Sequence, residues 1–352
     1  MRMENEELNF LKKFFAPYTS RVYLVGGCVR DEILGIKSKE FDIEVYDITP
    51  EKFDVLMQKL GAKGVGKSFF VYKWKNFDIS LPRTETKTSA GHRGFEVSLT
   101  QDEKTASKRR DFTMNALMKN IYTGEMLDFW GGVRDIKNRI IRHIDDKSFA
   151  EDPLRVLRAM QFASRLKFKI DKGTVNICRK LNLYELSRER IFMEFEKMFN
   201  SKYLYYGFYY FITLNIARKL LNITFTKREF FHLSKIYKTN PIESYFLYHL
   251  RYYKNIKADL LITSLSLPNK LKKEIKIKKL PKTVTNRFLY ALSLKYPLKT
   301  FSILNNCCCR EWIKKENLWD KKYRPKQINP ENPRLSILQE IKKYDKIILK
   351  KG

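Results

Sequence analysis

The first fifty residues show a helical hydrophobic pattern followed by an extended one. Apolar positions recur every three or four residues over 4–16, which predicts a helix with one apolar side. The apolar, β-branched run at 22–25 predicts a buried strand, and Gly26-Gly27 ends it with no Cβ to obstruct a ligand. A short helix is expected over 29–34. Its free N–H groups would point back at the glycine turn, which makes that turn a place for phosphate.

The next predicted strand carries carboxylates at alternate positions. Glu40, Asp42 and Glu44 share one face, because side chains along a strand alternate between the two faces. Clustered carboxylates repel one another unless a divalent cation lies between them, and a nearby phosphate supplies a reason for that cation. The pattern therefore predicts a Mg²⁺-dependent phosphate site, with a plain acidic edge strand as the alternative. A later strand at 77–81 adds Asp78, which an ordinary exposed strand aspartate would also explain.

The next segments contain a clear helix start and a misleading motif. Thr49 and Pro50 are expected to cap and open a helix over 50–60. Residues 61–68 match the phosphate-binding P-loop pattern letter for letter. A working P-loop follows a strand and opens a helix, whereas here a helix precedes the motif and a β-rich run follows it. We therefore reject a P-loop at this position.

Charge changes the picture most in the C-terminal part. The chain of 352 residues has a formal net charge of +31, and residues 201–352 hold 33 Lys and Arg against 10 Asp and Glu. Such basicity on a folded, aromatic-rich chain indicates a polyanionic partner, nucleic acid first and an anionic membrane surface second. A lysine-biased genome is the alternative. Past residue 200 the pattern is helical, and the basic stretches 271–280 and 321–326 are candidates for tracking an RNA backbone.

Cysteine use and hydropathy indicate a soluble, cytoplasmic protein. The five cysteines include three adjacent ones at 307–309, and they show neither a disulfide framework nor zinc spacing. No apolar run approaches the roughly 20 residues of a membrane span, and the N-terminus lacks the apolar segment of a signal peptide. We expect no membrane partner, and the sequence leaves the oligomeric state open.

Two polar motifs carry further chemistry. Residues 109–117 read RRDFTMNAL, in which Asp111 can accept hydrogen bonds from ribose hydroxyls and the arginines can hold phosphate oxygens. Residues 151–159 read EDPLRVLRA and are expected to start a helix with Asp152 at its cap. Asp152 and Arg155 then share one face, where they can match the hydrogen-bonding edge of a base. Taken alone, the first motif is equally an arginine-rich helix cap and the second an ordinary ion pair.

The order of these motifs resembles a known family. The glycine turn, the acidic strand, RRDFT and EDxxR follow one another as in the class II nucleotidyltransferases, which comprise the bacterial and eukaryotic CCA-adding enzymes and bacterial poly(A) polymerases. The usual acidic pattern there is Lys-Asp-x-Asp, whereas this chain has Glu40 at the first Asp. Glutamate can ligate the same ion from one methylene further out. The resemblance covers roughly residues 20–200.

The resemblance implies a set of site residues. Asp42 and Glu40, aided by Asp78, would be catalytic, with Glu40 and Asp42 as the Mg²⁺ ligands. The implied nucleotide-binding residues are Gly26, Gly27, Arg30, Arg110, Asp111, Asn115, Asp152, Arg155 and Arg158. Among them, Asp152 and Arg155 would form the protein template that selects CTP and ATP. Residues 83–97 resemble the loop that helps to switch from CTP to ATP, and 187–194 resemble a helix start that braces the template helix.

The same resemblance implies fold and function. The expected fold class is α+β, with a nucleotidyltransferase head (mixed β-sheet and flanking helices) over 1–120. A helical neck carrying the nucleotide template over 121–200 and a basic, tRNA-binding helical body and tail over 201–352 would follow. The expected activity is addition of CCA to tRNA 3′ ends from CTP and ATP. An A-adding enzyme shares these motifs. So does a poly(A) polymerase, although residues 66–73 differ from the strand typical of those enzymes. A non-catalytic RNA-binding protein is the alternative from another class.

Overall fold

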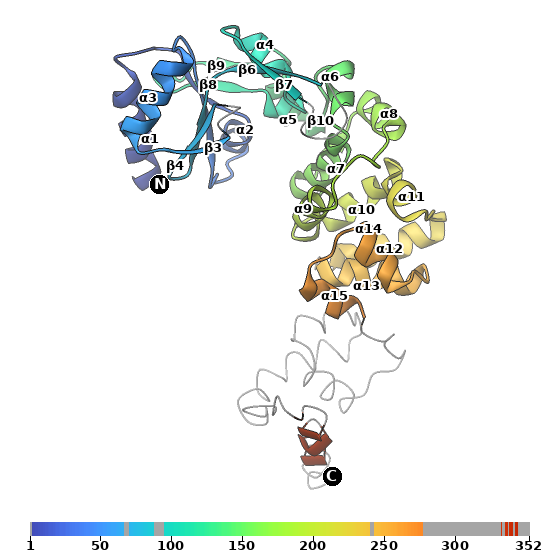
Figure 1. Ribbon diagram of the computed structural model, residues 1–352. Helices are drawn as coiled ribbons and strands as arrows, with labels where there is room; N and C mark the ends of the chain where they lie inside the picture. Colours follow the sequence, from blue (N-terminus) through green and yellow to red (C-terminus); the bar gives the residue numbers. More distant parts are fainter. Residues whose placement is uncertain are drawn as a thin grey trace.

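The protein extends from a sheet-containing head at one end to a series of packed helices (Figure 1). The computed structural model describes residues 2–66, 70–87, 95–239 and 243–276, and a few residues between 332 and 343. Within this part of the chain, strands lie among helices in the first 130 residues, and the remainder is mostly helical. The predicted α+β fold class is confirmed.

The head is built on a seven-stranded mixed sheet in the order β3-β4-β5-β2-β1-β8-β9. Its strands are β1 (Val22–Val25), β2 (Phe41–Val45), β3 (Lys63–Gly66), β4 (Val71–Trp74), β5 (Phe77–Ser80), β8 (Met118–Asn120) and β9 (Met126–Leu127). In this sheet β2 and β5 run parallel, and the other neighbouring strands run antiparallel. The parallel pair brings two acidic strands together in the middle of the sheet.

The two faces of the sheet have different roles. Helices α1 (Arg2–Phe15) and α3 (Pro50–Leu60) cover one face, where their apolar side chains pack on Ile43, Val45 and Ile79. Because side chains alternate along a strand, Asp42 and Glu44 of β2 point to the opposite face. That face is next to α2 (Gly27–Ile33), so the acidic residues lie where the glycine turn ends β1.

Local signals in the sequence set several boundaries in the head. The side chain of Thr49 accepts a hydrogen bond from the Lys52 backbone N–H, and Pro50 opens α3, as predicted. Gly61 closes this helix in the left-handed conformation. Residues 63–66 of the rejected P-loop motif form the edge strand β3, and Lys67 and Ser68 lie outside the described residues.

Short elements connect the sheet to the helical part. In chain order they are the hairpin β6 (Arg83–Lys87) and β7 (Phe95–Leu99), α4 (Glu103–Lys108), the 3₁₀ turn η2 (Thr113–Asn115), α5 (Gly132–Asn138), β10 (Ile140–Ile141), α6 (Asp146–Glu151) and β11 (Lys169–Ile170). Strands β10 and β11 pair in parallel. In the sequence, β10 precedes and β11 follows the central helix α7 (Leu154–Leu166). Within the predicted loop over 83–97, the two ends pair with each other as the strands of one β-hairpin. Residues 88–94, between these strands, lie outside the described residues.

The helical part packs around α7. The helices that follow are α8 (Lys172–Lys180), α9 (Arg188–Phe199), α10 (Leu204–Thr213), α11 (Ile216–Leu221), α12 (Lys227–Thr239), α13 (Glu243–Tyr253), α14 (Ala258–Ser264) and α15 (Asn269–Ile275). The aromatic run of α10 is mostly core, with Phe208 and Phe211 fully buried, although Tyr209 is 44% exposed. The largest hydrophobic cluster is continuous from Cys28 in the head to Ile275.

Three sequence predictions are not tested by the described helices and strands. Residues 277–280 of the basic stretch 271–280, and all of 321–326, lie outside the described residues. The head boundary at residue 120 stays a prediction, and strand β9 at Met126–Leu127 still belongs to the head sheet. None of the described helices is both long enough and apolar enough to cross a membrane.

Candidate active site

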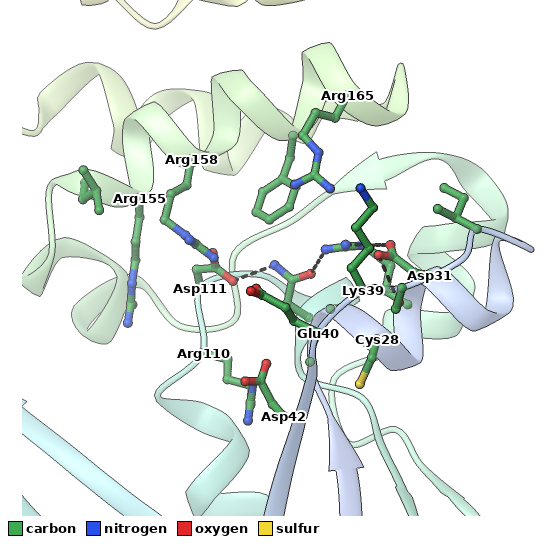
Figure 2. A pocket seen from close by; sticks show the side chains of 18 of the residues that line it. Cys28, Asp31, Lys39, Glu40, Asp42, Arg110, Asp111, Arg155, Arg158 and Arg165 are labelled. Atoms are coloured by element: carbon green, nitrogen blue, oxygen red, sulfur yellow. Dashed lines mark hydrogen bonds and ion pairs between the residues drawn. The ribbon is translucent and has the colours of Figure 1, made fainter. Parts of the chain in front are cut away.

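A pocket of about 930 Å³ lies between the acidic end of the sheet and helix α7. Figure 2 shows Arg155, Arg158 and Arg165 projecting from this helix toward Asp111, Glu40 and Asp42. The pocket is lined by Gly26, Gly27, Cys28, Arg30, Asp31, Ile36, Lys37, Ser38, Lys39, Glu40, Asp42, Arg109, Arg110, Asp111, Asn115, Asp152, Leu154, Arg155, Arg158, Phe162, Arg165 and Arg190. The structure thus brings together every residue that the sequence nominates except Asp78, which lies next to the pocket on β5.

Asp42 and Asp78 are paired by the sheet itself. They are register partners across the parallel strands β2 and β5, so both side chains are on the pocket face. Asp78 Oδ1 is buried and has no hydrogen-bond partner among the described residues. Burial and the neighbouring carboxylates of Asp78 and Glu44 raise the pKa of Asp42, although Arg110 opposes this shift. These two carboxylates repel each other, and one oxygen of Asp78 lacks a hydrogen-bond partner. Such a pair is chemically suited to ligate a divalent cation.

Glu40 is less fixed than the sequence pattern suggests. Its side chain is 80% exposed, and its carboxylate forms a long ion pair with Lys73 Nζ at 3.9 Å. Within the part of the chain that the structure describes, no three acidic, histidine or cysteine side chains are arranged to hold a metal ion. The Asp42–Asp78 pair is therefore in place, while Glu40 would have to move to complete a set of three ligands.

Glu44 serves the arginines of the RRDFT motif. Its carboxylate is 1% exposed and accepts hydrogen bonds from Arg109 and Arg110, each at 2.9 Å, and from the hydroxyl of Tyr46 at 3.2 Å. Burial opposes ionisation here, but the two guanidinium groups hold the pKa of Glu44 below its usual value. Glu44 therefore anchors these arginines at the pocket wall, and this role accounts for its position in the alternating pattern.

The glycine turn leaves room for Arg110. Gly26 has a φ of 77°, a conformation that side-chain-bearing residues rarely adopt. A Cβ at this position would lie 2.6 Å from Arg110 Nη1 and 3.6 Å from Asp42 Oδ2. The missing side chain therefore lets the guanidinium group and the carboxylate approach the backbone at the start of α2. The close approach of Arg110 and Asp42, in addition to the positive φ of the turn, explains why residue 26 is glycine.

A chain of polar contacts ties the head to helix α7. Arg158 Nε donates to Asp111 Oδ2 at 2.6 Å, and Asn115 Nδ2 donates to Asp111 Oδ1 at 2.9 Å. Arg30 donates in turn to Asn115 Oδ1 and, through Nε and Nη2, to Asp31. Asp111 is 7% exposed, and Arg158 and Asn115 keep its pKa low despite burial. Arg30 is 3% exposed, so its donors are committed to this network rather than directed into open space.

The EDxxR residues are held by separate partners. Asp152 forms an ion pair with Arg190 at 3.0 Å, while Arg155 donates to the backbone carbonyls of Ser148 and Arg109 at 2.7 and 2.6 Å. The ordinary intrahelical ion pair considered for this motif is thus replaced by contacts to other elements. The helix begins one residue later than expected, with Pro153 at the cap, and Asp152 Oδ1 still accepts from the Leu154 N–H.

Sequence reasoning missed several pocket residues, and helical spacing from the nominated Arg155 and Arg158 was an available signal for two of them, Phe162 and Arg165. Arg155, Arg158, Phe162 and Arg165 are spaced by three or four residues, which places them on one face of α7. Arg165 lies against the ring of Phe162 at 5.7 Å, and burial lowers its pKa. Arg190 was assigned only through the bracing segment 187–194, and its pairing with Asp152 required the three-dimensional structure.

Cys28 lines the pocket but is unsuited to nucleophilic chemistry. Its Sγ lies 3.3 Å from the carbonyl oxygen of Val25, to which it donates. Burial raises the pKa of the thiol to about 11, so it stays protonated at neutral pH. Cys28 is therefore a small packing residue beneath the glycine turn.

Family models match this chain in two places. The poly(A) polymerase head domain matches residues 22–142, and a probable RNA and SrmB-binding site of polymerase A matches residues 167–225. The first match contains the glycine turn, the acidic strands and the RRDFT motif in the order that places them around the pocket. The chain belongs to the class II tRNA nucleotidyltransferase and poly(A) polymerase family.

Individual relatives support this membership over part of their length. The multifunctional CCA protein of Psychromonas ingrahamii is 41% identical over 189 residues, which cover 49% of this chain and 44% of that protein. The multifunctional CCA protein of Pasteurella multocida is 40% identical over 192 residues, which cover 50% of this chain and 43% of that protein. The matched part of this chain therefore covers less than half the length of each of these curated relatives.

Solved structures share the fold over most of the chain. The Bacillus stearothermophilus CCA-adding enzyme in complex with CTP has a TM-score of 0.73 at 23% identity, covering 91% of this chain and 82% of that one. The Thermotoga maritima CCA-adding enzyme complexed with tRNA has a TM-score of 0.65 at 24% identity, covering 93% of this chain and 84% of that one. At these identities the likeness establishes the fold.

Proposed function

We propose that the chain is a template-independent tRNA nucleotidyltransferase that adds CCA to tRNA 3′ ends from CTP and ATP and releases pyrophosphate. The observation that carries the proposal is one pocket that joins Asp42, the RRDFT arginines and the Asp152–Arg155 helix. The names of the relatives, multifunctional CCA protein and CCA-adding enzyme with CTP or tRNA, support it. The reaction is a nucleotidyl transfer, in which the tRNA 3′-hydroxyl attacks the α-phosphorus of the nucleotide.

The base-selecting end of the pocket is built on α7 and α9. Arg190 fixes the carboxylate of Asp152, and two backbone carbonyls fix the guanidinium group of Arg155. Each of these side chains keeps polar atoms that can face a base, because a carboxylate accepts several hydrogen bonds and a guanidinium group has five donors. We assign Asp152 and Arg155 to the acceptor and donor edge that selects cytosine and adenine. Arg158 positions Asp111, which lines the pocket and which we assign to the ribose hydroxyls.

The phosphate end of the pocket is formed by the glycine turn and the RRDFT motif. Gly26 and Gly27 line the pocket, and Arg110 is held beside Gly26 by Glu44. Oriented guanidinium groups bind phosphate oxygens strongly, and groups fixed before binding need little reorganisation during reaction. We assign Gly26, Gly27 and Arg110 to the triphosphate. Arg30 and Asn115 support this wall through their contacts with Asp31 and Asp111.

The cofactor that we propose is Mg²⁺, held by Asp42 with Asp78, and by Glu40 once its side chain turns inward. Mg²⁺ bound there would neutralise the triphosphate and activate the attacking hydroxyl group. The chain's own contribution is to align the two substrates, since positioning supplies much of the rate in phosphoryl and nucleotidyl transfer. The basic helical part beyond residue 200 is the proposed docking surface for tRNA.

A terminal-addition assay tests this function. Purified protein with Mg²⁺ is given three radiolabelled tRNA transcripts that end at the discriminator base, at C or at CC, with CTP, ATP or both. We expect the first transcript to gain three nucleotides only when both substrates are present. Asp42→Ala is the matched inactive variant, and we expect it to add no nucleotide.

The other outcomes identify the alternatives. Addition of one A to the CC-ended transcript alone would mean an A-adding enzyme, and long untemplated A tails would mean a poly(A) polymerase. Equal activity of the parent and Asp42→Ala would contradict the assigned catalytic residue. An absence of addition to every transcript, with tRNA still bound, would identify a non-catalytic RNA-binding protein.

A further inference from the structure

Lys73 extends the row of carboxylates on the pocket face of the sheet. It lies directly opposite Asp78 across the antiparallel strands β4 and β5, and Asp78 lies opposite Asp42 across β5 and β2. Residues in register on neighbouring strands project to the same side of the sheet. The three side chains therefore form a row on one face of the sheet, from the cation on β4 to the carboxylates on β5 and β2.

The ammonium group of Lys73 is close to two of the candidate metal ligands. Its Nζ lies 3.5 Å from Asp78 Oδ1 and 3.9 Å from Glu40 Oε1. Neither contact is a hydrogen bond, since Asp78 Oδ1 has no hydrogen-bond partner in the described structure and 3.9 Å to Glu40 is too long for one. Lys73 is 43% exposed, so the lysine neutralises these carboxylates without being locked to them. The neighbouring Phe77 and Trp74 point to the opposite, apolar face, where their rings pack together.

We propose that Lys73 is a resident counter-cation of the metal site and competes with the divalent ion for Glu40 and Asp78. With no metal bound, it offsets the repulsion among the carboxylates that face the pocket. When a divalent ion binds, the same positive charge repels it, and the side chain must leave Asp78 Oδ1. Lys73 thereby weakens metal binding in the absence of nucleotide. This inference rests on the metal-binding part of the proposed function.

Glu40 is the second carboxylate near this ammonium group. It stands where the resembling family pattern has Asp, and its carboxylate lies 3.9 Å from the ammonium group of Lys73 on β4. Displacement of the lysine frees Glu40 and Asp78 together, which links completion of the metal site to the departure of one side chain.

The test measures Mn²⁺ binding to the full chain without nucleotide, using the electron paramagnetic resonance signal of free Mn²⁺. Lys73→Met removes the charge and keeps the side-chain length, while Lys73→Arg keeps the charge. Lys75→Met is the matched control, because Lys75 is on the same hairpin but pairs with Glu7 at 3.0 Å. We expect Lys73→Met to bind Mn²⁺ roughly fivefold more tightly, the size of a half-exposed ion pair. Lys73→Arg and Lys75→Met should stay within about twofold of the parent.

Asp42→Asn separates the possible failures. If Mn²⁺ binding depends on Asp42 but is unchanged or weakened in Lys73→Met, the proposed counter-cation role of Lys73 is wrong, while the metal assignment to Asp42 is supported. If the parent and Lys73→Met both lack binding that depends on Asp42, the metal assignment and the counter-cation fail together. Equal tightening in Lys75→Met would trace the effect to overall charge and would also overturn the specific role of Lys73.

Discussion

Asp111 is a carboxylate whose charge is paired inside the protein. Arg158, Asn115 and the Phe112 backbone N–H donate to its oxygens. Burial raises its pKa, but the charge of Arg158 and the hydrogen bond from Asn115 outweigh burial and keep the pKa below the ordinary value of 3.8. A carboxyl whose pKa is lower in the folded than in the unfolded state stabilises the fold above the unfolded pKa. That contribution is lost as the pH falls through the folded pKa.

We therefore expect Asp111→Asn to lower the free energy of unfolding by about 2 kcal/mol near neutral pH. The difference between variant and parent should shrink below about pH 4, where the carboxyl in the unfolded chain becomes protonated. Urea unfolding followed at several pH values measures both quantities. A difference that stays constant down to the most acidic pH would show that the charge of Asp111 contributes nothing.

Arg190 acts on the nucleotide through Asp152. Its guanidinium group is 3.0 Å from one oxygen of that carboxylate and 3.3 Å from the other, so it sets the orientation of the proposed base acceptor. We expect Arg190→Gln to lower kcat/KM for CTP and ATP roughly tenfold and to raise misincorporation of UTP and GTP. Steady-state kinetics with all four nucleotides measures this. Arg188→Gln, an exposed position on the same helix, is the control. Equal kinetics in the two variants would leave Arg190 with no role in selection.

The sequence indicates which side chains belong to the site better than it indicates what each one contacts. The motifs nominated Asp42, Asp111 and Asp152 because each stands in a short pattern with a chemical reason. The partners of these residues could not be predicted, since Arg158 is 47 residues from Asp111 and Arg190 is 38 residues from Asp152. Pairings of this kind depend on how helices pack and not on local spacing.

At the scale of elements, two glycines allow close packing for different reasons. A Cβ on Gly132 at the start of α5 would lie 2.3 Å from the backbone oxygen of Thr113, which cannot move without shifting η2. A Cβ on Gly26 would meet the end of a flexible Arg110 side chain instead. The first replacement therefore disturbs the backbone, while the second disturbs the pocket.

We expect Gly132→Ala to lower the free energy of unfolding by about 3 kcal/mol. Gly26→Ala should cost about 1 kcal/mol, because of its positive φ, and should lose most of the nucleotide-addition activity. Urea unfolding and the terminal-addition assay, applied to both variants, give the comparison. If the two replacements changed stability equally, the backbone clash at Thr113 would not be the cause.

Element boundaries followed from local chemistry, whereas the sheet order did not. Thr49, Pro50 and Gly61 set the ends of α3, because capping and glycine conformation act within a few residues. The parallel pairing of β2 with β5 is a non-local contact between Asp42 and Asp78. The family resemblance supplied Asp78 as a candidate. Only the sheet register explains why this carboxylate, opposite Asp42 on the same face, is the one that faces the pocket.

At the scale of the whole molecule, the head and helices share a core and a polar network. The largest hydrophobic cluster includes Val29 of α2 and Phe162 of α7, and the contacts from Arg158 to Asp31 cross the same boundary. The phosphate end and the base end of the pocket are therefore held in one arrangement. The division into head, neck and body stays a prediction. The head has a further hydrophobic cluster of its own between the sheet and helices α1 and α3, and the shared cluster joins α2 to the helical part.

The last prediction concerns the net charge of +31 and whether its basic residues bind the tRNA backbone. If the basic helical part binds the tRNA backbone, each phosphate contact releases counterions and contributes roughly −0.7 to −0.9 to the slope of log K against log salt. We expect a slope of about −3 or steeper between about 50 and 200 mM KCl, measured by fluorescence anisotropy with labelled tRNA. CTP binding to the same protein, followed in parallel, should be much less salt-dependent because it engages few phosphates. A slope near zero for tRNA would mean that the lysines form an ordinary solvated surface, as a lysine-biased composition would produce, and that tRNA is recognised chiefly at the pocket.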